Sequence, residues 1–124
     1  MTKVSGLKIL EDVKNSLGIS KEDDSFDSEI LMHINGAYIL INQVGACKEG
    51  LEITNETIWD DILRDEQEEG NKSFSIIKQY IFTKVKVLFD PPQTSATLEV
   101  LTNLSDELLW RIRLAYEERN SEGR

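Results

Sequence analysis

The side chains that most often carry chemistry are scarce in this 124-residue chain, which holds one histidine, His33, and one cysteine, Cys47. One cysteine excludes an internal disulfide and a cysteine zinc cluster, and one histidine weakens most metal-site and catalytic-triad schemes. His33 lies at the edge of an apolar helical stripe. We interpret it as a packing histidine, with a ligand or base role as the alternative. Cys47 follows Gly45 in a predicted loop and is interpreted as a structural thiol.

Motifs for catalysis are also missing. The sequence contains no glycine-rich phosphate loop, no nucleophile elbow and no zinc-binding pattern. Asp60 and Asp61 are adjacent, so on a helix their side chains diverge by about 100° and do not form an acid–base pair. We therefore predict no enzymatic activity, no cofactor and no bound metal.

The chain is acidic, with 14 basic and 23 acidic side chains and a formal net charge of −9. This balance disfavours wrapping of a phosphate backbone, because affinity for phosphate comes from Lys and Arg. Residues 1–62 carry a net charge of −7, and residues 63–124 carry −2. The densest acidic run, which we interpret first as a solvated loop, contains Asp65, Glu66, Glu68 and Glu69.

Length and composition predict one soluble intracellular domain over residues 1–124, with residues 119–124 as a flexible tail. The hydrophobic content of 40% is ordinary for a folded domain and too high for a disordered chain. No run of about 18 apolar residues is present, and the N-terminal segment lacks the features of a signal peptide. We therefore expect no contact with a membrane.

The spacing of apolar residues predicts an all-α bundle of four to five helices with a long C-terminal helix. The expected helices span about residues 4–17, 27–44, 56–64, 72–89 and 94–119. The predicted caps are Asp24, Ser25 or Asp27 for the second helix, a box of Thr57 and Asp60 for the third, and Thr94 or Ser95 for the last. The step Asp90-Pro91-Pro92 ends the fourth helix, because proline disfavours helical geometry in the residue before it.

The fourth predicted helix is apolar around much of its circumference, so we expect it to lie centrally and touch several neighbours. Its stripes contain Phe74, Ile77, Ile81, Val85 and Leu88, and beside them Ile76, Tyr80 and Val87. A buried strand over residues 80–89 is the rival interpretation, but the length and period favour a helix. Lys84 falls among these apolar residues. Either its stem is buried while its ammonium group reaches water, or it forms an ion pair.

The last predicted helix is about 39 Å long, whereas a domain of this length has a radius of gyration of about 14 Å. Its distal end, from Glu117 onward, is therefore expected to project beyond the core. A broad sector is predicted to face the core and contains Leu98, Leu101, Leu104, Leu108, Leu109, Ile112, Ala115 and Tyr116.

Three apolar residues of this helix, Val100, Trp110 and Leu114, fall on the side opposite the predicted core face. Either another helix of the chain covers them, or they contact another chain. Arg111 adjoins Trp110, and both residue types are enriched at interaction hot spots.

Two segments resemble the phage head–tail connector proteins, a family also known as phage DNA-packaging proteins of Gram-positive tailed phages and prophages. The first is Ile77–Pro92, with Tyr80, Lys84 and the Asp90-Pro91-Pro92 step, and the second is Glu107-Leu108-Leu109-Trp110-Arg111. The resemblance implies a structural virion protein at the head–tail junction, assembled in the host cytoplasm. It also implies a ring of about a dozen copies beneath the portal protein.

The same resemblance implies that the ring extends the DNA channel and offers a docking surface to a tail or stopper protein. DNA would pass through without sequence-specific binding. Val100, Trp110 and Leu114 would then contact a neighbouring subunit or the portal, and Lys84 and Arg111 would pair with acids across an interface. The acidic run at residues 65–69 would line the channel, where a negative surface repels DNA phosphates.

Two alternatives remain open at this stage. A small acidic regulatory module would bind another protein through Val100, Trp110 and Leu114. A packaging subunit that touches DNA directly would use the acid-free segment Lys72–Lys86, although these lysines lie on a helix that is otherwise expected to be buried.

Overall fold

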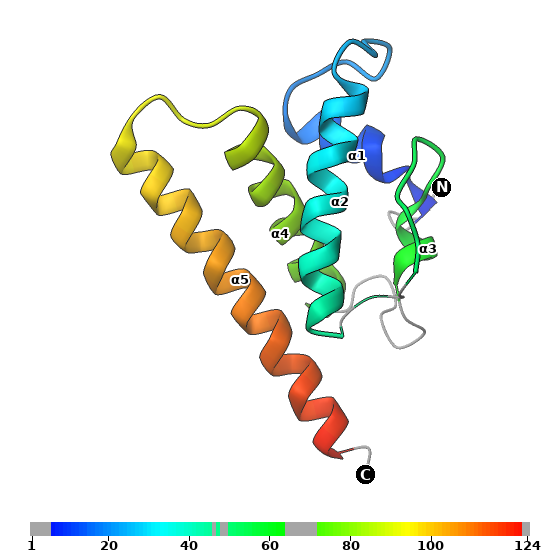
Figure 1. The fold of residues 1–124 in the computed structure, drawn as a ribbon, viewed down its shortest axis with the longest axis vertical. Coiled ribbons are helices and arrows are strands. Elements are labelled where there is room, and N and C mark those ends of the chain that lie inside the picture. The colour runs from blue at the N-terminus through cyan, green and yellow to red at the C-terminus, as the bar shows by residue number, and fades with distance from the viewer. Residues whose placement is uncertain (1–5, 46, 48–49, 64–71, 123–124) are drawn as a thin grey trace.

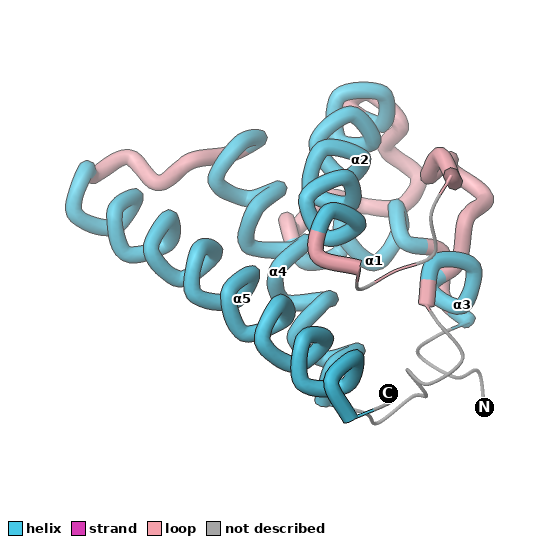
Figure 2. Tube along the Cα trace, turned by 60° about the horizontal axis from the view of Figure 1, so that its bottom comes forward, coloured by secondary structure: helices cyan, strands magenta, loops and turns pink. Residues whose placement is uncertain are grey.

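A computed structural model describes residues 6–45, 47, 50–63 and 72–122, with side chains for all of these except 72–73 and 116–122. Its helices are α1 (Ile9–Ser16), α2 (Asp27–Gln43), α3 (Trp59–Ile62), α4 (Lys72–Phe89) and α5 (Ser95–Glu122). Within this described part there is no strand, so the predicted all-α class is confirmed (Figure 2). None of the described helices has the length and apolar character that crossing a membrane requires.

The helices are stacked in an order that leaves α5 at one edge of the molecule. Helix α5 packs against α4, α4 packs against α2, and α1 closes against both α2 and α4. The segment 50–55 and α3 lie at the opposite edge from α5 (Figures 1 and 2). The expectation that residues 72–89 form a central helix, rather than containing a strand, is therefore confirmed.

The core is drawn from all five helices and from two connecting segments. Its most buried members, with side chains almost closed to solvent, are Ile9, Val13, Ile30, Ile34, Ala37, Tyr38, Ile41, Ile53, Trp59, Ile62, Ile77, Tyr80, Ile81 and Val85. Among the described side chains of α5, Leu108 and Ile112 are the buried apolar ones. Burying an aliphatic side chain of this kind contributes about 1.5–3 kcal/mol.

A polar cluster joins α1, α3 and α4 inside this apolar surrounding. The ammonium group of Lys78 lies 3.2 Å from Asp12 Oδ2 and within 6 Å of the ring centroids of Trp59, Phe74 and Phe82. The same Asp12 oxygen accepts a hydrogen bond of 3.0 Å from the Trp59 indole nitrogen. The Asp12 carboxylate thus pairs with the partly buried ammonium group of Lys78 and also accepts the indole N–H of the fully buried Trp59.

A second lysine fixes the other end of α1. Lys14 is only 2% exposed, yet its ammonium group lies 2.8 Å from Asp27 Oδ1 and donates to the Lys21 carbonyl at 3.2 Å. Asp27 is the first residue of α2, where a carboxylate also meets the positive end of the helix dipole. Lys14 therefore links the end of α1 to the start of α2 and to the connection between them.

The predicted start of the first helix is wrong for the residues the structure describes. Helix α1 begins at Ile9, because residues 7–9 pair with the segment before α3. The Leu7 carbonyl accepts a hydrogen bond from the backbone N–H of Trp59, and the backbone N–H of Ile9 donates to the Thr57 carbonyl. A tertiary contact between distant segments thus replaces the first helical turn.

The predicted caps are corrected at two helices. Phe26, rather than Asp24, Ser25 or Asp27, precedes α2, and no side chain caps that helix. The third helix is only four residues long, and its capping carboxylate is Asp61, which accepts from the Ile58 N–H at 2.9 Å. At α5 the prediction of Thr94 is confirmed, because its hydroxyl accepts from the Thr97 N–H.

Two residues predicted to face the core do not. Leu88 is exposed because it lies in the last turn of α4, where the chain turns away at Asp90. Leu104 is 39% exposed because it lies at the margin of the sector that α4 covers, and Ser105 is buried instead. Helix α5 continues to Glu122, and its C-terminal end extends past the other helices, as expected (Figure 1).

The polar cluster gives the first testable prediction. Replacing Asp12 by Ala leaves a shielded ammonium group and an indole N–H without their acceptor, so we expect a loss of about 3 kcal/mol in unfolding free energy, measured in urea. Asp12→Asn keeps an acceptor for Trp59 but removes the charge, and should fall between Asp12→Ala and the natural chain.

The matched control is Glu56→Ala, which removes a 3.4 Å pair with Lys8 in which the Glu56 side chain is 72% exposed. This change should cost less than about 1 kcal/mol, because solvent screens surface pairs. Equal losses in Asp12→Ala and Glu56→Ala would contradict the special role of the cluster.

Candidate interaction surfaces

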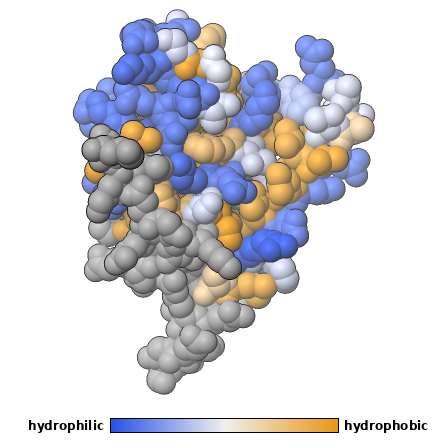
Figure 3. Space-filling model, turned by 180° about the vertical axis from the view of Figure 1, so that it is seen from behind, coloured by the Kyte–Doolittle hydropathy of each residue, from blue (hydrophilic) through white to orange (hydrophobic). Residues whose placement is uncertain are grey.

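The outer face of α5 carries apolar side chains that no described residue covers. Val100 is 64% exposed and Trp110 is 53% exposed, and both lie on the helix side turned away from α4. Leu114, predicted on the same side, is only half-buried. Figure 3, which views the molecule from behind, shows apolar side chains gathered in an oblique band on the side of α4 and α5. We call Val100, Trp110 and Leu114 the outer face of α5.

This face is left open because α5 uses its other side to bind α4. Leu108 and Ile112 enter the core there, and the buried Ser105, one turn before Leu108, donates its hydroxyl to the Thr102 carbonyl. Burial raises the pKa of Tyr80 on α4 to about 12, and the nearby charge of Asp106 on α5 adds to this effect. Because α5 contacts α4 through the side that holds Leu108 and Ile112, Val100 and Trp110 on the other side stay exposed.

Arg111, the basic residue next to Trp110, forms only an exposed ion pair within its own helix. Arg111 lies 3.1 Å from Glu107 Oε1, one helical turn away, and both side chains are more than half exposed. Such a pair contributes little to stability, so the guanidinium group is available to an acid on another molecule.

Lys84, the other predicted interface cation, is half-buried on α4. No carboxylate of the described residues lies within 4.0 Å of its ammonium group, so the predicted ion pair is not formed within this part of the chain. Its position fits the interpretation of a buried stem with a head that reaches water.

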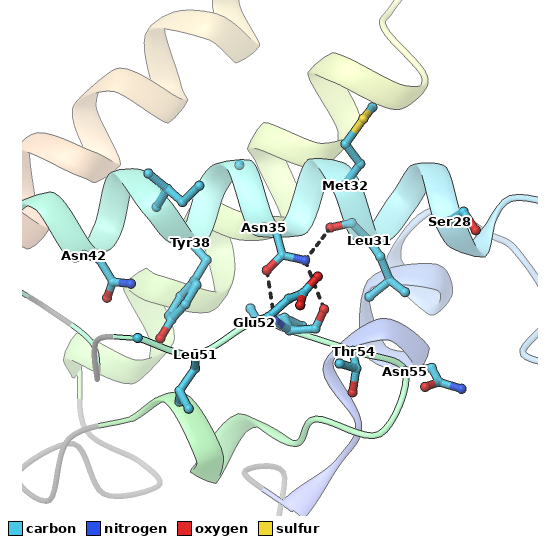
Figure 4. A pocket seen from close by; sticks show the side chains of 14 residues that line it. Ser28, Leu31, Met32, Asn35, Tyr38, Asn42, Leu51, Glu52, Thr54 and Asn55 are labelled. Carbon is cyan, nitrogen blue, oxygen red and sulfur yellow. Dashed lines mark hydrogen bonds between the residues drawn. The ribbon is translucent and has the colours of Figure 1, made fainter.

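A second surface, which the sequence did not indicate, is an open groove between α2 and the segment 50–55. Its volume is about 910 Å³. Asn35 on α2 binds the backbone of the segment 50–55. Its amide oxygen accepts a hydrogen bond from the Ile53 N–H at 2.9 Å. The Asn35 amide nitrogen donates to the carbonyls of Ile53 and Leu31 at 3.0 Å (Figure 4). The extended segment is therefore fixed to the helix by one side chain. An asparagine in the middle of an apolar helix was the available signal.

The groove combines exposed apolar side chains with an acidic residue. Met32, Ile39 and Leu51 are among its lining residues and are all largely exposed. Glu52 also lines the groove, and Glu29 lies on α2, the helix that forms one of its walls. Residues 22–47 and 50–63 contain no lysine or arginine. The groove thus combines exposed apolar side chains with one charged residue, Glu52.

The remaining candidates from the sequence form no site in the described residues. His33 is largely buried, and its Nε2 lies 3.9 Å from Glu29 Oε1, beyond hydrogen-bonding distance. Cys47 is buried and pairs with Leu63 through an isolated bridge. No three metal-ligating side chains converge within the described ranges. Asp65, Glu66, Glu68 and Glu69 lie outside the described residues.

The comparison with protein families identifies the class of protein. A family model described as phage connector protein matches residues 9–119, which include α1 to α4 and most of α5. The chain therefore belongs to the phage connector protein family, and its role is that of a structural protein of the phage head–tail connector type. No curated protein and no solved structure matches the chain.

The two tryptophans give the second prediction. Trp110→Ala removes a half-exposed side chain from the outer face of α5, so the unfolding free energy should change by less than about 1 kcal/mol. Trp59→Ala empties a fully buried site and should cost about 3–5 kcal/mol. Urea unfolding followed by circular dichroism measures both. If Trp110→Ala were as damaging as Trp59→Ala, Trp110 would belong to the core and the outer face would not exist.

Proposed function

We propose that copies of this chain, acting as a single connector domain, form a ring of about a dozen subunits beneath the portal protein. The ring extends the DNA channel and offers its far side to a tail or stopper protein. The observation that carries the proposal is the exposed outer face of α5 in a chain that belongs to the phage connector family. Trp110 and Arg111 are of the residue types that dominate interaction hot spots.

The proposal assigns a contact to the exposed residues of α5 and to Lys84 on α4. Val100, Trp110 and Leu114 contact a neighbouring subunit, and Arg111 pairs there with an acidic side chain. Lys84 reaches an acid across the same assembly. The projecting end of α5 extends past the other helices, which favours a contact with the portal or with the docking partner (Figure 1).

The net charge of −9 supports passage of DNA without retention. A negative lumen repels phosphates, so a duplex slides rather than binds. We propose that the acidic run at residues 65–69 faces this lumen. A ring in which that run lies on the outer rim would overturn this part of the proposal.

The ring is tested by native mass spectrometry of the purified chain, alone and mixed with its cognate portal protein. We expect a species with about a dozen copies at least when the portal is present, because rings of this kind can require the portal as a template. Trp110→Ala should reduce that species by about 30-fold in apparent affinity, as for a hot-spot residue.

A chain that stays monomeric with its portal at high concentration would contradict the proposal. It would favour the alternative of a small regulatory module that binds another protein through the same face. Electrophoretic mobility assays at low salt address direct DNA contact, and measurable affinity for duplex DNA would contradict a lumen that only repels it.

A further inference from the structure

We propose that the groove between α2 and residues 50–55 receives the outer face of α5 from the next copy of this chain. The inference rests on the ring proposed above and specifies which two surfaces meet. It also assigns a function to the groove, whose lining includes none of the residues that carry the family resemblance.

A ring built from identical subunits needs two unlike surfaces on each copy. Head-to-tail contacts close into a ring when one surface of a subunit binds a different surface of its neighbour. Among the described residues, the outer face of α5 and the groove are two unlike surfaces that expose apolar side chains. They lie at opposite edges of the molecule, with α4 and the body of α2 between them (Figures 1 and 2).

Both surfaces have the spacing of helices that pack side by side. On α2, the side opposite the core carries groove residues at alternating steps of four and three, namely Ser28, Met32, Asn35, Ile39 and Asn42. On α5, Val100, Glu107 and Leu114 are seven residues apart, and Trp110 falls between the last two. Steps of three and four keep side chains on one stripe and allow two helices to pack at a shallow angle.

Charge favours this pairing over two grooves meeting. Glu52 is the one charged residue among those that line the groove. Arg111 next to Trp110 is held only by a weak surface pair with Glu107. A contact between the two surfaces brings Arg111 toward Glu52, whereas a groove against a groove would oppose two Glu52 carboxylates.

Gly36 offers a variant that separates this contact from folding. It lines the groove, and a Cβ placed on it would meet no atom within 4 Å. Gly36→Gln therefore adds a Cβ without a clash and improves helix propensity, and its longer side chain extends into the open groove, where the partner helix would lie. We expect the melting temperature to stay the same or rise, while assembly on the portal weakens by about 30-fold, as for loss of a hot spot. Gly36→Ala adds one methyl group and serves as the milder comparison.

Disulfide cross-linking locates the contact directly. Three exposed asparagines are changed singly to cysteine: Asn103 on the outer side of α5, Asn55 at the groove, and Asn15 on α1 as the control. Tagged Asn103→Cys chains are mixed with Asn55→Cys or Asn15→Cys chains, assembled with the portal protein and oxidised. We expect a heterodimer band for Asn103 with Asn55, and none for Asn103 with Asn15.

The outcomes distinguish this inference from the ring itself. If rings form on the portal while Asn103 and Asn55 do not cross-link and Gly36→Gln assembles like the natural chain, the assignment of the groove is wrong and the ring proposal stands. If no ring-sized species forms under any condition, the proposed function fails, and this inference fails with it.

Discussion

Helix α4 is apolar around most of its circumference, and the positions of the other helices follow from the need to cover it. Helices α1, α2 and α5 pack against it, and Trp59 from α3 meets its aromatic side chains edge to face. Lys78, a charge on the side of α4 that meets α1 and α3, is tolerated because Asp12 and three aromatic rings surround it. The Asp12 carboxylate therefore determines where α1 and α3 are placed on α4.

The same constraint explains why the molecule has unused surfaces. Helix α5 is needed to cover one side of α4, and only one side of α5 is needed for that. Helix α2 covers another side of α4 and likewise keeps an outward stripe, to which Asn35 attaches the segment 50–55. A chain with a single central helix thus acquires two outward helix faces at opposite edges. A head-to-tail assembly needs this arrangement.

Much of the fold could be predicted from the sequence, because the longest helices carry a clear apolar period. The ranges of α2 and α4 and the stop at Asp90-Pro91-Pro92 were predictable in this way. The start of α1 was not, because Leu7 and Ile9 bond to a segment about 50 residues away. Leu88 and Leu104 were assigned to the core because periodicity gives the direction of a side chain but not the extent of its neighbours.

The candidate sites likewise differ in whether local helix geometry or a long-range contact determines them. The exposure of Val100 and Trp110 follows from helix geometry alone, so the sequence indicated it. The groove depends on a side chain of α2 that bonds to backbone 18 residues later, and local periodicity contains no information on such a bond. The role of Trp59 was missed because its partners, Asp12 and Lys78, come from helices distant in the sequence.

The most direct test is electron cryomicroscopy of the portal protein assembled with this chain. The account predicts a closed ring, coaxial with the portal channel, in which neighbouring copies meet through the outer face of α5. One or a few copies bound at the periphery of the portal, or a ring with Trp110 facing solvent in every copy, would contradict it.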